Sequence, residues 1–125
     1  MPVVLESISR FHELFPEDRD TEFVLAGLLA LSGDWGRSRG LLTKLAAGET
    51  DQPDTWTFGA VREAGHLGDV ITLLKQTGAN ERWRPLYKAL RAIQSGSRQY
   101  LRRVAPEVRT VAEAILKEIA PDLPE

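Results

Sequence analysis

The sequence predicts an all-α protein in which antiparallel helix hairpins are stacked as an array of about seven or eight helices. Three observations support this fold class. Apolar residues recur at helical spacing along the chain, and strict alternation at period two is absent over any useful length. Three glycines, Gly33, Gly65 and Gly96, lie 32 and 31 residues apart, and each divides a pair of predicted helices. Glycine can adopt a positive φ there, which lets two helices fold back on each other.

The first helix is predicted by Val4, Ile8, Phe11 and Phe15, which fall on one helical face and therefore form a candidate core stripe. Pro16 ends this helix, because the residue before a proline is disfavoured in the α region.

The remaining segments follow from the same apolar spacing and from signals at their ends. Asp20 or Thr21, Asp54 and Ser97 are the expected N-caps, and Pro106 suits a first helical turn because its missing N–H has no partner there. We expect helices at about residues 21–32, 35–47, 55–64, 67–77, 83–94, 97–104 and 106–119.

Length and composition restrict the class of protein. A chain of 125 residues is enough for one compact domain, and 42% apolar with 27% charged residues is typical of a soluble globular protein. The lack of cysteine excludes disulfides, thiolate metal sites and cysteine nucleophiles. No apolar run approaches the roughly 18 residues that span a bilayer, and residues 1–10 lack the basic start of a signal peptide. We therefore expect a cytoplasmic protein that does not enter a membrane.

The domain organisation is expected to be a single unit over residues 1–125. It consists of an N-terminal helix, three hairpins, a C-terminal helix that caps the array, and a tail. These parts correspond to residues 1–19, 20–105, 106–120 and 121–125. Because the C-terminal helix covers the apolar end of the array, we expect a monomer or a weak homodimer.

One stretch carries a family resemblance. The segment from Leu25 to Trp35, with Gly-Asp-Trp at the bend, resembles the first helix and turn of a tetratricopeptide repeat, and Ser38 with Leu42 match its second helix. The resemblance implies a short right-handed α-solenoid whose concave face is lined by first helices. Residues 81–105 are also similar to the closing segment of repeat arrays in bacterial signalling or ATPase proteins. The alternative is an irregular helical bundle with coincidental glycine spacing.

The charge is distributed unevenly. Residues 1–80 carry a net −5, residues 81–110 carry +6 and residues 111–125 carry −3, within an overall net charge of −2. Such a chain can present a basic stripe beside acidic surface. The first interpretation is a set of solvated helix faces with intramolecular ion pairs, and the alternative is a site for anions.

Signals for catalysis and cofactors are weak. Residues 36–40 match the G-x-S-x-G string of a nucleophile elbow, but they follow a helix and no strand precedes the serine. His12 and His66 are too few for a histidine metal site, and we expect His12 to be partly buried and His66 exposed. Glycine-rich nucleotide-binding strings are absent. We therefore predict no metal, no cofactor and no enzymatic activity.

The function that remains is protein binding. A helix-lined surface can bind a peptide or a partner protein through aromatic and arginine anchors, and the basic third hairpin favours an acidic partner. Trp83, Tyr87 and Tyr100 among the arginines of 82–109 suggest nucleic-acid binding as an alternative, ranked lower because the pI is near 5.7. An immunity or antitoxin protein is a third possibility. The candidate protein-binding residues are Phe23, Arg62, Trp83, Arg84 and Arg91.

Overall fold

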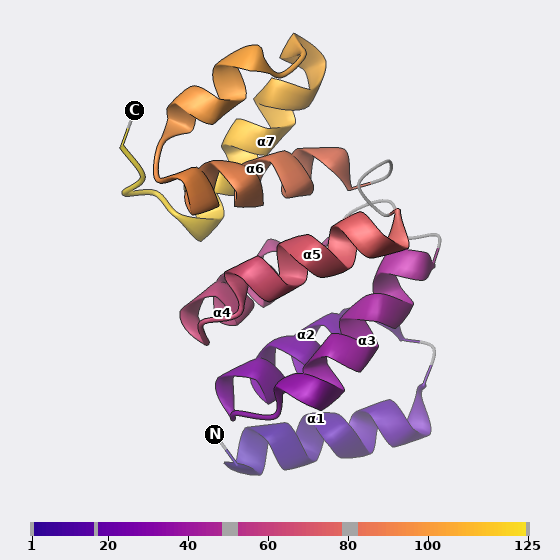
Figure 1. The fold of residues 1–125 in the computed structure, drawn as a ribbon. Helices are drawn as coiled ribbons and strands as arrows, with labels where there is room; N and C mark the ends of the chain where they lie inside the picture. The colour runs from indigo at the N-terminus through magenta and orange to yellow at the C-terminus, as the bar shows by residue number, and fades with distance from the viewer. Residues whose placement is uncertain (1, 17, 49–52, 79–82, 125) are drawn as a thin grey trace.

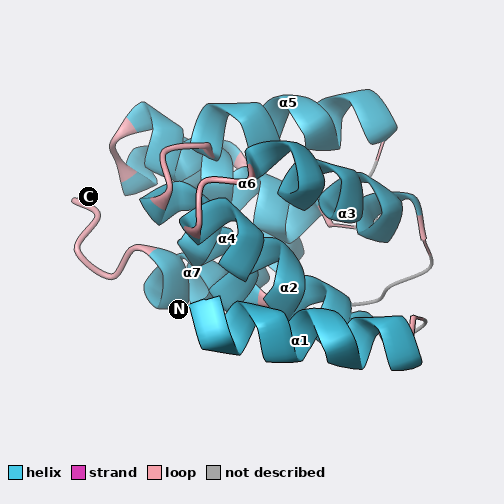
Figure 2. Ribbon diagram, turned by 90° about the horizontal axis from the view of Figure 1, so that it is seen from below, coloured by secondary structure: helices cyan, strands magenta, loops and turns pink. Residues whose placement is uncertain are grey.

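The computed structural model describes residues 2–16, 18–48, 53–78 and 83–124 and shows an all-α fold, as predicted (Figure 1). Helices and loops, without a strand, make up these ranges (Figure 2). The elements are α1 (Pro2–Leu14), α2 (Arg19–Leu31), α3 (Trp35–Ala47), α4 (Thr55–Glu63), α5 (Leu67–Thr77), α6 (Arg84–Ser95), the 3₁₀ helix η2 (Arg98–Arg103) and α7 (Pro106–Ile119).

The helices pack in two rows. Helix α2 contacts α4, and α4 contacts α7, whereas α3 contacts α5, and α5 contacts α6. The pairs α2–α3 and α6–α7 join the two rows, and α1 lies against α2 at one end (Figures 1 and 2). The third predicted pair differs from the first two, because its second member is the short η2 and α7 lies beside α6. The N-terminal helix and the basic C-terminal elements therefore form opposite ends of the molecule (Figure 1).

The three regularly spaced glycines make the same turn. Gly33, Gly65 and Gly96 have φ of 92°, 88° and 84°. In each turn the N–H of the glycine, residue i, donates to the carbonyl of residue i−3 at 3.0–3.2 Å. The N–H of the following residue, i+1, donates to the carbonyl of residue i−4 at 2.9–3.3 Å. This is the Schellman pattern, which needs a left-handed residue and so favours glycine. The predicted positive φ is confirmed at all three positions.

Most helix ends follow the predicted signals. The predicted caps Asp54 and Ser97 begin α4 and η2 with their side-chain oxygens, and α7 begins at Pro106. Helix α3 is capped by the carboxylate of Asp34, which was not among the expected caps. The prediction that Asp20 or Thr21 caps the second helix is wrong. Asp18 is the N-cap, because its carboxylate accepts the Thr21 N–H at 3.2 Å and the helix begins two to three residues earlier.

Two buried hydroxyl groups fix the spacing around α2. Ser38 Oγ in α3 donates to the carbonyl of Ala26 at 2.7 Å, and Thr57 Oγ1 in α4 donates to the carbonyl of Phe23 at 2.8 Å. Both hydroxyl side chains are fully buried, and Ala26 itself is wholly buried where a larger side chain would separate the helices. Ser38, the centre of the G-x-S-x-G string, is thus an inaccessible packing residue.

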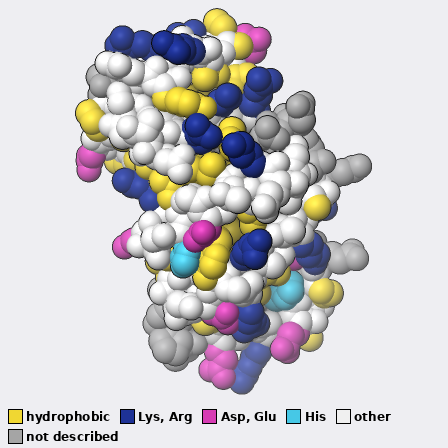
Figure 3. Space-filling model, in the orientation of Figure 1, with side chains coloured by type: hydrophobic (Ala, Val, Ile, Leu, Met, Phe, Trp, Pro, Cys, Tyr) yellow, Lys and Arg dark blue, Asp and Glu magenta, His cyan; other side chains and the backbone are white. Residues whose placement is uncertain are grey.

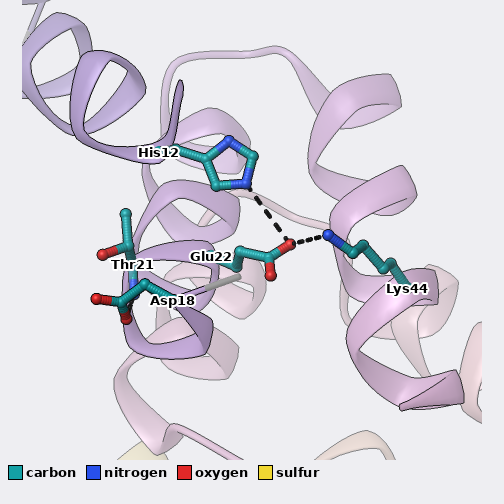
Figure 4. Close-up of polar contacts among 5 residues, drawn as sticks. All are labelled: His12, Asp18, Thr21, Glu22 and Lys44. Carbon is teal, nitrogen blue, oxygen red and sulfur yellow. Dashed lines mark hydrogen bonds and ion pairs between the residues drawn. The ribbon is translucent and has the colours of Figure 1, made fainter. Parts of the chain in front are cut away.

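A buried carboxylate joins α1, α2 and α3. Glu22 in α2 is only 2% exposed, and its Oε2 atom accepts from Lys44 Nζ of α3 at 2.9 Å (Figure 4). His12 Nε2 of α1 points at the same oxygen from 3.7 Å (Figure 4). His12 is partly buried, as predicted. A buried carboxylate requires such a cation, so this cluster is a structural tie between three helices.

Some predicted core residues face solvent. Phe11 and Phe15, on α1 and the following turn, are 42% and 53% exposed. Two further large apolar residues, Trp56 and Val111, are 47% and 48% exposed. Helix α1 contacts α2 only along its inner side, so its apolar stripe is wider than the surface that covers it. The side chain of Val4, the fourth member of the predicted stripe, lies outside the described residues.

Candidate functional site

A concave surface lies between α6, η2 and the first turn of α7. We call it the cationic groove, and its volume is about 810 Å³. It is lined by Arg84, Lys88, Ser95, Ser97, Gln99, Tyr100, Arg102, Arg103, Val104, Ala105, Glu107 and Val108. The lining therefore has four cationic side chains and one carboxylate, that of Glu107. The floor of the groove contains half-buried apolar side chains.

Local structure explains why these cations converge. Arg84 and Lys88 are one turn apart on α6, on the side opposite the buried residues Leu86, Leu90 and Ile93. The Ser97 cap starts η2 directly after α6, so Arg102 and Arg103 lie in the last turn of η2. The chain is extended at Val104 and turns into α7 at Pro106. Two consecutive turns thus bring cations from separate elements around one hollow.

Intramolecular ion pairs do not involve three of the groove's cations in the part of the chain that the structure describes. The ion pairs found there join Arg10 with Glu6, Arg37 with Asp34, Lys44 and His12 with Glu22, and His66 with Asp69. None of them involves Arg84, Lys88 or Arg103, so the expected pairing of the basic stripe is absent at these three residues. Figure 3 shows Lys and Arg side chains gathered over the end of the molecule formed by α6 and α7, whereas acidic side chains are more frequent toward α1.

The aromatic side chains near the groove are already engaged. Lys88 Nζ and Arg91 Cζ lie 5.8 and 5.7 Å from the centroid of the Tyr100 ring. The same two cations lie 5.9 and 6.0 Å from the Tyr87 ring, and Arg91 Nη1 donates to Tyr87 Oη at 3.4 Å. Arg91 is therefore held between two tyrosines, and the half-buried face of Tyr100 carries cations.

The predicted site residues do not form one site. Phe23 and Trp83 are 2% and 1% exposed and pack together with ring centroids 6.0 Å apart, so their assignment as protein-binding residues is wrong. They belong to the core because their helices are covered on more than one side. Arg62 is exposed and donates to the carbonyl of Ile119 at 3.2 Å, in a different depression between α4 and α7. Of the five predicted residues, only Arg84 lines the cationic groove. Arg91 lies further along the same helix, α6.

Sequence reasoning about single residues missed several groove members. Lys88, Tyr100, Arg102 and Arg103 belong to the basic stripe 82–109, whose net positive charge was the available signal. Arg82 of the same stripe lies outside the described residues. Arg98 is positively charged but structural, because its guanidinium donates to the carbonyls of Pro121 and Leu123 and holds the C-terminal tail against η2.

A second depression of about 690 Å³ lies between α2, α4 and α7. Exposed Trp56 borders it, with its ring against Gly27 of α2. Arg62, Glu63 and Glu118 give it mixed charge. The hydroxyl of Thr55 donates to Glu118 across its edge. Because its charges are balanced and already partly bonded, this depression offers less to a charged ligand than the cationic groove.

The remaining titratable clusters are small. His66 stacks on Trp35 with ring centroids 4.3 Å apart, and its Nδ1 lies 2.8 Å from Asp69 Oδ2. The predicted exposure of His66 is therefore wrong, because the ring is half-buried against Trp35. Within the described ranges, no group of three or more His, Asp or Glu side chains is placed to hold a metal ion.

Comparison with known proteins adds no assignment. No family model, curated protein or solved structure matches this chain. None of the helices in the described ranges combines the length and apolar character that a membrane span requires. The function is therefore inferred from the geometry and charge of the cationic groove.

Proposed function

We propose that the chain is a non-catalytic protein-interaction module whose cationic groove binds an acidic segment of a protein partner. The observation that carries this proposal is the groove itself, in which Arg84, Lys88, Arg102 and Arg103 surround an apolar base that includes Val104. Such a site suits a segment with acidic side chains at its edges and an apolar side chain between them.

The scaffold is proposed to be a short right-handed array similar to tetratricopeptide repeats. Three features support this interpretation: the equivalent glycine turns, the stacking of α2 on α4 and of α3 on α5, and the small residue Ala26 at a close helix contact. In such arrays a ligand is held by side chains on a rigid helical surface. The groove extends this principle to the end of the array, where η2 and α7 follow α6.

A peptide is favoured over a single-stranded nucleic acid by the state of the aromatic residues. Binding of single strands uses aromatic faces on which bases stack. Trp83 and Tyr87 are buried, and the Tyr100 ring already carries Lys88 and Arg91. Two of the three residues that suggested base stacking are thus buried and the third already contacts cations, whereas carboxylates need only the cations.

The test is the binding of a labelled peptide rich in Asp, Glu and Leu, followed by fluorescence anisotropy. A peptide with Asn and Gln in place of the acids is the ligand control. The binding variant is Arg84→Glu with Arg103→Glu, and the matched control is Arg39→Glu, an exposed arginine on α3. We expect the double variant to bind about tenfold or more weakly, equivalent to about 1.4 kcal/mol, and the control to bind like the wild type.

Salt dependence provides a second readout. Raising the ionic strength from about 0.1 M to about 1 M shortens the Debye length from roughly 10 Å to roughly 3 Å and should weaken the binding strongly. Binding that is insensitive to salt and to both groove substitutions would overturn the proposal. Tighter binding of a random single-stranded DNA than of the acidic peptide would favour the nucleic-acid alternative instead.

A further inference from the structure

We infer that one acidic segment suited to the cationic groove is carried by this chain, so that copies associate head to tail. The inference rests on the proposed function, because it names a partner for the same groove. The segment is the end of α1 with the start of α2, and we call its residues the α1 tip: Phe11, Glu13, Leu14, Phe15 and Asp18. In a second copy these side chains dock between α6, η2 and α7.

Three large apolar side chains of the α1 tip are exposed together. Phe11, Leu14 and Phe15 are 42%, 75% and 53% exposed, and they occupy positions i, i+3 and i+4, which form one helical face. The two phenyl rings are in contact, with centroids 4.7 Å apart, so they form a continuous patch. Exposed patches of this kind mark interaction surfaces, and aromatic side chains are frequent binding anchors.

The tip and the groove are complementary in charge. Residues 1–20 contain five acidic and two basic residues, for a net −3, against +6 for residues 81–110. Asp18 shares a shallow depression with Leu14 and Phe15, and Glu13 and Asp20 are exposed on the adjoining turns of α1 and α2. Arg19, a basic residue of this region, directs its guanidinium at Gly48 at the end of α3. The tip thus combines aromatic anchors with carboxylates, which is the chemistry the groove requires.

The position of the two surfaces determines the mode of association. Helix α1 lies at the opposite end of the molecule from α6, which lines the cationic groove (Figure 1). The tip of one copy therefore reaches the groove of another copy and not its own. Each contact leaves one tip and one groove free. Such a heterologous contact extends to further copies unless the rotation between copies closes a ring. Because one helix end fills one groove, the interface is small and the association weak.

The test measures the mass of the full-length chain by sedimentation velocity over a range of concentrations. We expect the wild type to grow in mass with concentration at low salt and to become monomeric at about 1 M salt. Two variants each remove one surface: Leu14→Ser with Phe15→Ser at the tip, and Arg84→Glu with Arg103→Glu in the groove. Since all four residues are exposed, both variants should fold, and circular dichroism verifies this.

Mixing the variants tests the head-to-tail geometry. Each variant alone should be monomeric, but an equimolar mixture should form a one-to-one dimer and nothing larger, because the mixture contains one intact tip and one intact groove. Arg39→Glu should associate like the wild type. Self-association that persists in the groove variant, or a mixture that stays monomeric, overturns the inference.

The result also separates this inference from the proposed function. A wild-type chain that stays monomeric at all concentrations but binds the labelled acidic peptide overturns self-association and leaves the peptide-binding proposal standing. A chain that shows neither property overturns both.

Discussion

The substitution of glycine by alanine should lower the stability of the protein at one position and raise it at another, because the two positions differ in backbone conformation. Gly65 has φ of 88° in the turn between α4 and α5, whereas Gly40 lies inside α3. A Cβ atom at either position would meet nothing within 4 Å, so steric clashes contribute at neither site. Holding alanine in a left-handed conformation costs about 1–2 kcal/mol, whereas alanine inside a helix is favoured over glycine by about 1 kcal/mol.

These free energies convert into measurable temperature shifts. An unfolding entropy of about 2.1 cal/mol/K per residue, applied to 125 residues, makes 1 kcal/mol equivalent to about 4 °C. Thermal unfolding followed by far-UV circular dichroism should therefore show Gly65→Ala about 4–8 °C below the wild type and Gly40→Ala about 4 °C above it. Gly65→Asn should lose less than Gly65→Ala, because asparagine tolerates the left-handed region. Equal Tm values for the two alanine variants would refute the turn assignment.

Three further substitutions test the packing around α2. Lys44→Met, which removes the cation 2.9 Å from buried Glu22, should lower the unfolding free energy in urea by about 1–2 kcal/mol, and by much less in a Glu22→Gln background. Thr57→Val removes the hydroxyl that donates to the Phe23 carbonyl and should cost about 1 kcal/mol in the same assay. Trp83→Ala should lower the unfolding free energy by about 3–5 kcal/mol. Because Trp83 is a core residue, peptide binding should be lost only to the extent that the helical far-UV circular dichroism signal is lost.

The secondary structure could be predicted because its determinants are local. Helix spans depend on apolar spacing, on caps such as Asp34 and Asp54, and on glycines that accept a positive φ, and all of these are visible in a single sequence. The cap of α2 was misplaced because Asp18 and Asp20 are chemically equivalent candidates. Only the backbone geometry, with the Thr21 N–H directed at Asp18, distinguishes them.

The role of an apolar residue could not be predicted in the same way. Periodicity shows that Phe23 and Phe11 lie on apolar faces, but it does not show how many neighbours a helix has. Helix α2 contacts α1, α3 and α4, so Phe23 is covered, whereas α1 contacts α2 and leaves Phe11 partly exposed. Phe23, which was predicted to bind a partner, is therefore buried in the core, and Phe11, which was predicted to be core, is partly exposed. Burial depends on contacts between segments that are distant in the chain.

The groove was predictable in charge but not in shape. The excess of basic residues in 81–110 is a property of the sequence, whereas the convergence of Lys88, Arg102 and Arg103 depends on η2 and on the start of α7. Arg98 shows the difference most clearly. Its charge is indistinguishable from that of its neighbours, yet its guanidinium is bonded to carbonyls of the tail.

Both proposed ligands use the same groove, and this links them thermodynamically. An acidic partner segment and the α1 tip of a second copy each need the cations of α6 and η2, so one excludes the other. Binding of a partner therefore competes with growth of the head-to-tail assembly, and each copy at the growing end offers one free groove. The proposed contact between copies is small and salt-sensitive, so it is expected to yield to a tighter-binding acidic segment. Under these two proposals, a partner segment that carries more carboxylates than the α1 tip is the stronger competitor for the groove.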